Sequence, residues 1–315
     1  FLALCTDNLS DPLISGVEAP ENFNTVLYTG NGANDYAITG VGFQPDFVWN
    51  KSRAADYHGL WDVIRGVDSR LYTNTSDQAN TGTDAFESFD SDGFTLNLNS
   101  TWNNNTTNYV SWNWKAGGTA ASNTDGSITS SVSANPTAGF SIIKWTGTGS
   151  DATVGHGLSQ APDLVINKSL NNGATSQLWA FQSILWTSAS DTNMLYLPGT
   201  AAQADDTNVF QAAPTASVFS PQGGAWSGIG VNAIDYITYC FHSVEGYSKV
   251  GTYEGNSNAD GPFIYTGFTP AYILCKNVDN ASQYWNIKDN KRPEYNLESK
   301  TLFANANIAE QTDNG

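Results

Sequence analysis

Apolar and polar positions along the chain follow one pattern that occurs three times. Each copy is a proline, an apolar run and a lysine, and the proline-to-lysine distance is 6 residues in every copy (45 to 51, 162 to 168, 270 to 276). A glycine precedes each proline by 15 residues, at Gly30, Gly147 and Gly255. Two spacings kept over three copies indicate a tandem repeat.

The residues of each copy predict strands rather than helices. Proline fixes φ and has no N–H to donate, so it suits the entry of a strand. The residues after it are mostly β-branched or aromatic, which favours a pleated surface. Near the ends of the first two copies, 109–115 and 236–242 alternate aromatic or apolar with polar residues, which is typical of strands. We expect an all-β fold of tandem antiparallel β-sandwich units with short connectors and little helix.

These landmarks divide the chain into five segments. They are a lead-in linker at 1–22, β-sandwich unit one at 23–118, a connector at 119–138, β-sandwich unit two at 139–247 and β-sandwich unit three at 248–315. The connector is rich in Ser, Thr and Gly, and we expect one short strand in it, at 127–132.

Unit three is expected to be incomplete. The glycine anchor lies 79 residues before the closing strand in unit one (30 to 109) and 89 before it in unit two (147 to 236), but 60 residues follow Gly255 (255 to 315). The final 313–315 resemble 91–93, which precede the last two strands of unit one. Either the polypeptide continues past 315 or a neighbouring chain supplies those strands. We expect an open sheet edge near 302–305 or partner strands that fill it.

Composition and charge exclude several classes of partner. The hydrophobic fraction is 40% with 10 Trp, which is enough for real cores, whereas charged residues are only 14%. A net charge of −17 argues against nucleic acid and against anionic lipid surfaces. The three cysteines, Cys5, Cys240 and Cys275, include no CxxC pair, so neither a disulfide framework nor a zinc site is indicated. No apolar stretch approaches the length of a membrane span, so we expect no membrane insertion.

The sequence favours no catalytic or metal chemistry. It contains no Gly-x-Ser-x-Gly motif, and its histidines, His58, His156 and His242, have no placed partner. His156 lies in a Gly-His-Gly turn, which favours a structural role. Residues 90–93 begin like a calcium loop, but Thr101 stands where the bidentate glutamate is needed. We therefore expect no enzyme activity, no catalytic or metal-binding residue and no cofactor.

Two tryptophans are candidate glycan contacts. Trp102 and Trp226 lie in polar or glycine-rich loops before the closing strands of units one and two. Each ring either presents a flat face to a sugar or folds back over the end of its sandwich.

Two further sets of residues recur between the units. The first consists of aromatic residues among apolar neighbours, which we expect in the cores: Tyr28, Trp145 and Tyr253, and Trp61, Trp179 and Trp285. The second consists of the repeat lysines, which we expect where each strand exits into solvent: Lys51, Lys168 and Lys276.

Four segments of unit one resemble a domain that tailed-phage virion proteins carry in tandem. They are 24–32, 42–53, 91–94 and 112–118. The lead-in at 2–9 resembles the segment that follows a SPRY-type, concanavalin-like sandwich in those proteins. The resemblance covers nearly the whole chain and is weaker in unit three, where Ala271 replaces the aspartate of the proline turn. It implies a virion location and an exposed surface, and it supplies neither a catalytic site nor a defined ligand.

The expected function is therefore that of a phage virion structural protein. It would be a tail fibre, a tail appendage or a capsid-surface fibre that presents a non-catalytic surface for assembly or host attachment. The expected partners are copies of itself in a homo-oligomer, with a trimer favoured, other virion proteins, and a host surface glycan or protein. The alternative is a carbohydrate-binding module array of a secreted bacterial protein or a glycan-degrading enzyme.

Overall fold

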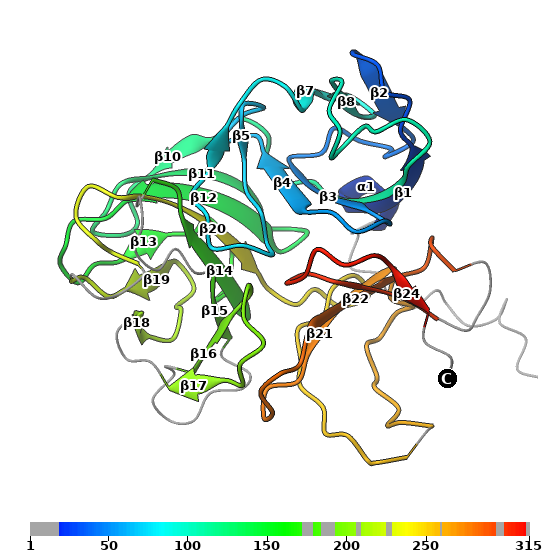
Figure 1. The fold of residues 1–315 in the computed structure, drawn as a ribbon. Helices are drawn as coiled ribbons and strands as arrows, with labels where there is room; N and C mark the ends of the chain where they lie inside the picture. The colour runs from blue at the N-terminus through cyan, green and yellow to red at the C-terminus, as the bar shows by residue number, and fades with distance from the viewer. Residues whose placement is uncertain are drawn as a thin grey trace, which may run out of the picture.

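The computed structural model describes residues 19–171, 179–183, 193–205, 209–224, 229–258, 260–293 and 299–312. Their fold is all-β, as predicted, and every strand pair in its sheets is antiparallel (Figure 1). Within those residues the one helix is α1 (Ala19–Asn22).

Unit one is a two-sheet sandwich. Its first sheet has the strand order β1 (Phe23–Thr29), β9 (Asn108–Trp114), β3 (Phe47–Ser52) and β4 (His58–Asp62), and its second has the order β2 (Tyr36–Thr39), β8 (Gly93–Leu96) and β7 (Phe86–Asp90). A short pair, β5 (Ser69–Arg70) and β6 (Asn80–Thr81), lies beside them. A buried apolar cluster that includes Val48, Trp61, Phe86, Phe94 and Trp102 joins the two sheets. The strands follow the proline turn and the aromatic alternation, as the sequence predicts.

Unit two repeats this plan with a larger sheet. Its strand order is β10 (Ala121–Asn123), β11 (Ser130–Asn135), β12 (Phe140–Thr146), β20 (Asp235–Phe241), β14 (Leu164–Ser169), β15 (Ala180–Ser183), β16 (Asn193–Tyr196) and β17 (Ala204–Asp205). Its second sheet is β13 (Val154–Gly155), β19 (Val218–Pro221) and β18 (Phe210–Ala212). The prediction for the connector needs correction, because it forms two strands that extend this sheet. β11 pairs with the edge of β12, and β10 pairs with β11. The local sequence of the connector does not predict these strands, because their pairing depends on a strand outside it.

Unit three has one sheet among the described residues. Its order is β21 (Tyr272–Lys276), β22 (Trp285–Asp289), β23 (Lys300–Phe303) and β24 (Gln311–Thr312). The predicted open edge near 302–305 is wrong. β24 pairs with Lys300 and Thr301, and side chains of unit one, His58 and Thr73, donate to the carbonyls of Phe303 and Ala304. Among the described residues, the open edge is that of β21. It is the edge at which β3 pairs with β9 in unit one and β14 pairs with β20 in unit two.

The three units close into a ring, which no sequence pattern predicted (Figure 1). One backbone hydrogen bond recurs at each interface, from an N–H to the carbonyl of the residue two positions after a repeat lysine. The three bonds run from Ala79 to Leu170 (3.0 Å), from Gln203 to Val278 (2.8 Å) and from Glu310 to Arg53 (2.9 Å). Unit one thus contacts unit two, unit two contacts unit three, and unit three contacts unit one. This cyclic order gives the chain an approximate threefold arrangement.

A single aromatic core fills the centre of the ring. Each interface has its own ring pair: Phe47 with Tyr239 (4.7 Å between centroids), Phe181 with Trp285 (4.6 Å), and Trp112 with Tyr272 (5.6 Å). These are separations at which tilted aromatic pairs attract. The cluster draws buried residues from all three units. The three tandem units therefore share one hydrophobic core and are not separate domains.

Strand register decides which core each repeated tryptophan enters. Trp61, Trp179 and Trp285 are all buried, as predicted. Trp285 pairs with Lys276, however, whereas Trp61 pairs with Val48, three positions earlier in the strand than the repeat lysine. An odd offset moves a side chain to the other face of a sheet. Trp61 therefore enters the core of its own sandwich, while Trp179 and Trp285 enter the ring core.

Candidate functional site

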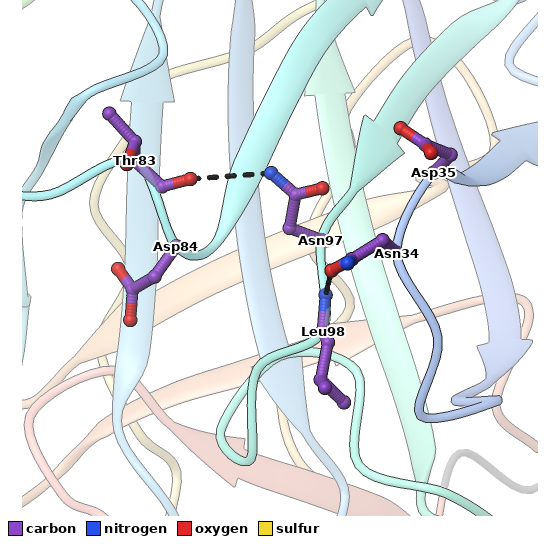
Figure 2. Close-up of a pocket in the computed structure, with 6 residues that line it drawn as sticks. All are labelled: Asn34, Asp35, Thr83, Asp84, Asn97 and Leu98. Atoms are coloured by element: carbon purple, nitrogen blue, oxygen red, sulfur yellow. Dashed lines mark hydrogen bonds between the residues drawn. The ribbon is translucent and has the colours of Figure 1, made fainter.

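A polar hollow of about 340 Å³ lies at one end of the second sheet of unit one (Figure 2). Three loops line it: Asn34 and Asp35 before β2, Thr83 and Asp84 before β7, and Asn97 and Leu98 after β8. The loops meet because Tyr36 and Phe86, at the starts of β2 and β7, both pair with Leu96 at the end of β8. Loops held by a rigid sheet in this way are common binding surfaces.

Hydrogen bonds between its own residues hold the hollow together. The Asn97 side-chain amide donates to the Thr83 carbonyl (3.2 Å) and to the Glu87 carboxylate (2.7 Å). The backbone N–H of Leu98 donates to the Asn34 side-chain oxygen (2.8 Å), as Figure 2 shows. These hydrogen bonds hold the three lining loops in place relative to one another.

The exposed groups of the hollow define its chemistry. Asp35 offers a carboxylate, and Leu98 offers an exposed apolar side chain. The Asp84 carboxylate already accepts from Arg70 (3.0 Å) and from the Asn99 amide (2.9 Å). This set suits hydrogen bonding to a polar ligand, and its six lining residues include no aromatic ring on which a sugar could stack. In the part of the chain that the structure describes, no group of three or more His, Cys, Asp or Glu side chains is placed to hold a metal ion.

Of the two candidate glycan contacts, Trp102 is buried. Its side chain is 1% exposed, and its ring meets Trp61 edge-on (5.3 Å between centroids) and Tyr72 (6.3 Å). Trp102 therefore closes the end of the sandwich, and its faces are not available to a sugar ring in this fold. Trp226 lies outside the described residues.

The histidines serve packing. Nδ1 of His58 accepts a hydrogen bond from the Trp49 indole (2.9 Å), so Nε2 carries the proton and donates to the Phe303 carbonyl of unit three (2.8 Å). Burial lowers the pKa of His58 well below its ordinary value, so the ring is neutral. Nε2 of His156 bonds to the Thr215 carbonyl (3.1 Å), which fits its predicted structural role.

The prediction that the repeat lysines exit into solvent is wrong for Lys51 and Lys168, which are both 0% exposed. The Lys168 ammonium donates to the Ser76 carbonyl of unit one (3.1 Å) and lies 6.0 Å from the centroid of the Trp179 ring. The ring arrangement covers these strand ends, because a loop of the neighbouring unit packs over them. Burial lowers the pKa of Lys168 to about 7 and that of Lys51 to about 8.

Lys168 should therefore make stability depend on pH. An unfolded lysine has a pKa of about 10.4, so between pH about 7 and 10.4 the unfolded state binds more protons here than the folded state. The free energy of unfolding then rises with pH over this range. We expect Lys168→Met to reduce that slope, as measured by chemical denaturation at pH 7, 8 and 9. The exposed Lys115→Met variant should keep the wild-type slope. Equal slopes in all three proteins would contradict the assignment.

Two buried ion pairs, each within one unit, lie at interfaces between units. They are Asp62 with Arg65 and Asp289 with Arg292, and all four side chains are at most 1% exposed. Each aspartate also accepts a hydrogen bond from a neighbouring unit, Asp62 from the Tyr239 hydroxyl (2.7 Å) and Asp289 from the Trp112 indole (3.1 Å). Tyr239 and Trp112 lie at matching positions of the closing strands β20 and β9. The same aspartate-to-aromatic contact therefore occurs at two of the three interfaces.

Sequence reasoning missed these pairs, although a signal was present. An aspartate precedes an arginine by three residues in units one and three (62 to 65, 289 to 292), and each aspartate is the last residue of a strand. In unit two, Ser183 occupies the aspartate's register position, so the motif is present in only two copies. The repeat was identified from spacings shared by all three units, so a motif present in only two of them was not noticed.

Comparison with known proteins gives a family and no more. No curated protein and no solved structure shows a significant match to this chain. Within its described residues, no helix has the length and apolar character needed to cross a membrane. A family model described as a domain of unknown function, DUF7483, matches residues 18–315. That match spans all three units of the ring, and the chain therefore belongs to the DUF7483 family.

Proposed function

We propose that this chain is a structural protein of a tailed-phage virion, in a tail fibre, tail appendage or capsid-surface fibre. The observation that carries the proposal is the closed ring, in which the same backbone hydrogen bond ties each unit to the next. Units that are hydrogen-bonded to one another around a closed ring make a stiff body, and a component that projects from a particle needs such stiffness. The segments of unit one that resemble virion proteins support the same role.

The surface chemistry agrees with a role on an extracellular particle. The net charge is −17, yet only 14% of residues are charged, so Asn, Ser and Thr supply much of the polar surface. A chain of this charge stays soluble and avoids nucleic acid. The proposed partners are other virion proteins, copies of the chain, and a host surface glycan or protein, all contacted without catalysis.

We further propose a homo-oligomer, with a trimer favoured. Closed symmetric assemblies are the usual form of homo-oligomers, and a body that is itself nearly threefold can take part in a threefold assembly without distortion. Because the chain's own repeats occupy the ring interfaces, contacts between copies must use its outer surfaces. Light scattering at high protein concentration measures this, and a monomer at every concentration would count against the trimer.

The polar hollow of unit one keeps the carbohydrate-binding alternative open to test. Its carboxylates and amides are groups that bind sugar hydroxyls. A glycan array probed with the wild-type chain and with Asp35→Ala separates the two functions. A sugar that binds the first and not the second, in a protein without virion association, would favour the module array.

The virion role is tested on particles. Antibodies raised against the purified chain should decorate phage particles in negative-stain micrographs, and mass spectrometry of gradient-purified virions should detect its peptides. Pre-immune serum and particles stripped of their tails are the matched controls. Peptides found only in the soluble fraction of a lysate, with undecorated particles, would overturn the proposal.

A further inference from the structure

The edge of β21 lacks a neighbour that its counterparts possess. In unit one β3 lies between β9 and β4, and in unit two β14 lies between β20 and β15. Among the described residues β21 pairs with β22 alone, so its other edge presents free backbone N–H and C=O groups. Such an edge is a template for another strand.

The aromatic residue that would cover this edge is also exposed. Tyr28 stacks on Tyr109 of the closing strand β9 (4.9 Å between centroids, 9° between planes), and Trp145 stacks on Tyr236 of β20 (4.5 Å, 19°). Tyr253, at the matching position of unit three, is 53% exposed, although we expected it in a core. Its hydroxyl lies 3.3 Å from Sγ of Cys275 on β21, as the Tyr28 hydroxyl lies near Asn50 on β3. Tyr253 therefore occupies the position of the first ring of the stack, and the described residues place no closing-strand tyrosine against it.

The outer face of β21 is bare as well. Ile273 lies three residues before its repeat lysine and is 46% exposed, whereas its counterparts Val48 and Val165 are 0% exposed. The second sheets of units one and two cover those valines. Upstream of β21, Phe263 and Tyr265 are among the most exposed large side chains of the described residues. Apolar exposure concentrated in one repeat marks an interaction surface.

The bare edge continues an interface that the ring already uses. The closing-strand aromatic of unit two bonds to Asp62 of unit one, and that of unit one bonds to Asp289 of unit three. In the same cyclic order, a closing strand on β21 would place its aromatic residue against unit two. Two of the three such contacts exist within the described residues. At the third, β21 is in place to pair with a closing strand, and unit two offers Ser183 where the other units have an aspartate.

We propose that unit three is a strand acceptor whose occupant is a polypeptide segment with the pattern of residues 93–114, a second-sheet strand followed by a closing strand. The closing strand would add antiparallel to β21, with its tyrosine on Tyr253. The register of unit one places Tyr272 opposite the Trp114 position and Lys276 opposite the Val110 position. The inference concerns assembly alone and stands whether or not the particle is a virion.

Ala271 defines where the bound segment ends. In unit one, the carboxylate of Asp46 holds the tail of the closing strand by accepting hydrogen bonds from the N–H groups of Ala116 (2.7 Å) and Gly118 (3.1 Å). Ala271 stands at that position in unit three and has no carboxylate. A bound strand is therefore held as far as the Trp114 position and gains nothing from a longer tail.

Disulfide trapping tests the register directly. In unit one Asn50 pairs with Ser111, so Cys275 should lie opposite the Ser111 position of a bound strand. A synthetic peptide of residues 93–115 with Ser111→Cys, its sulfur activated as a mixed disulfide with thionitrobenzoate, is incubated with the full chain in a Cys5→Ser background. The attacking thiolate of the chain displaces thionitrobenzoate, so no separate oxidant is needed. We expect a mixed disulfide with Cys275 that forms at least tenfold faster than with peptides carrying the cysteine at the Val110 or Trp112 position, which face the other side. Cys240 is fully buried and serves as the internal control.

A binding measurement keeps the test independent of thiol chemistry. The labelled 93–115 peptide should show saturable fluorescence anisotropy with a Cys275→Ser chain. The same peptide, N-methylated at alternate closing-strand residues, should bind at least tenfold more weakly, because it cannot donate to the edge. Equal trapping at all three positions, or no saturable binding, would overturn the proposal. A dimer linked through Cys275 of two copies would do so too, because a second copy would then occupy the edge.

Discussion

Replacing Trp112 by alanine should lower the free energy of unfolding by about 3–5 kcal/mol, the usual cost of deleting a buried large aromatic side chain. Trp112 is fully buried on β9, and its ring contacts Trp49 of its own unit (5.8 Å) and Tyr272 of unit three (5.6 Å). Its indole N–H also donates to Asp289, so the deletion leaves that buried carboxylate with one hydrogen bond fewer.

The variant should also uncouple unit three from unit one. Urea denaturation gives the loss of stability, and hydrogen exchange should show weaker protection in β21 and β22 than elsewhere. Leu98→Ala is the matched control, because Leu98 is exposed and its loss should change stability by no more than about 0.5 kcal/mol. A loss below about 1 kcal/mol for the Trp112 variant would mean that the ring core is not shared as described.

Replacing Arg65 by methionine should cost about 3–5 kcal/mol, because it leaves Asp62 buried without its cation. The guanidinium also donates to the carbonyls of Leu60 (3.0 Å) and Ser69 (2.7 Å), which lose their donors. Methionine keeps much of the volume, so the cost arises from charge and hydrogen bonding rather than from a cavity.

Two comparison variants separate charge from packing. Arg70→Met breaks the ion pair with the largely exposed Asp84, and it should cost at most about 1 kcal/mol. The double variant Asp62→Asn/Arg65→Met removes the uncompensated charge, so it should recover part of the stability lost in Arg65→Met. Thermal and urea unfolding of the four proteins measure this, and equal losses for Arg65→Met and Arg70→Met would contradict a buried, structurally important pair.

The sequence by itself determined the fold class and the positions of the repeated strands. The prolines at 45, 162 and 270 precede β3, β14 and β21 as predicted, because a fixed φ and the β-branched or aromatic residues that follow are local properties. The closing strands β9 and β20 follow from their alternation of aromatic and polar residues in the same way.

Only the tertiary structure decided how the units meet. The bonds that close the ring join residues 75 to 257 positions apart (203 to 278 and 53 to 310), and no local period encodes such contacts. Burial of Lys51 and Lys168 follows from this packing, because a lysine at a strand end is exposed in an isolated sandwich and covered in a ring. The open edge at β21 depends likewise on strand order, since which strand lacks a neighbour is a property of the sheet and not of the strand's own residues.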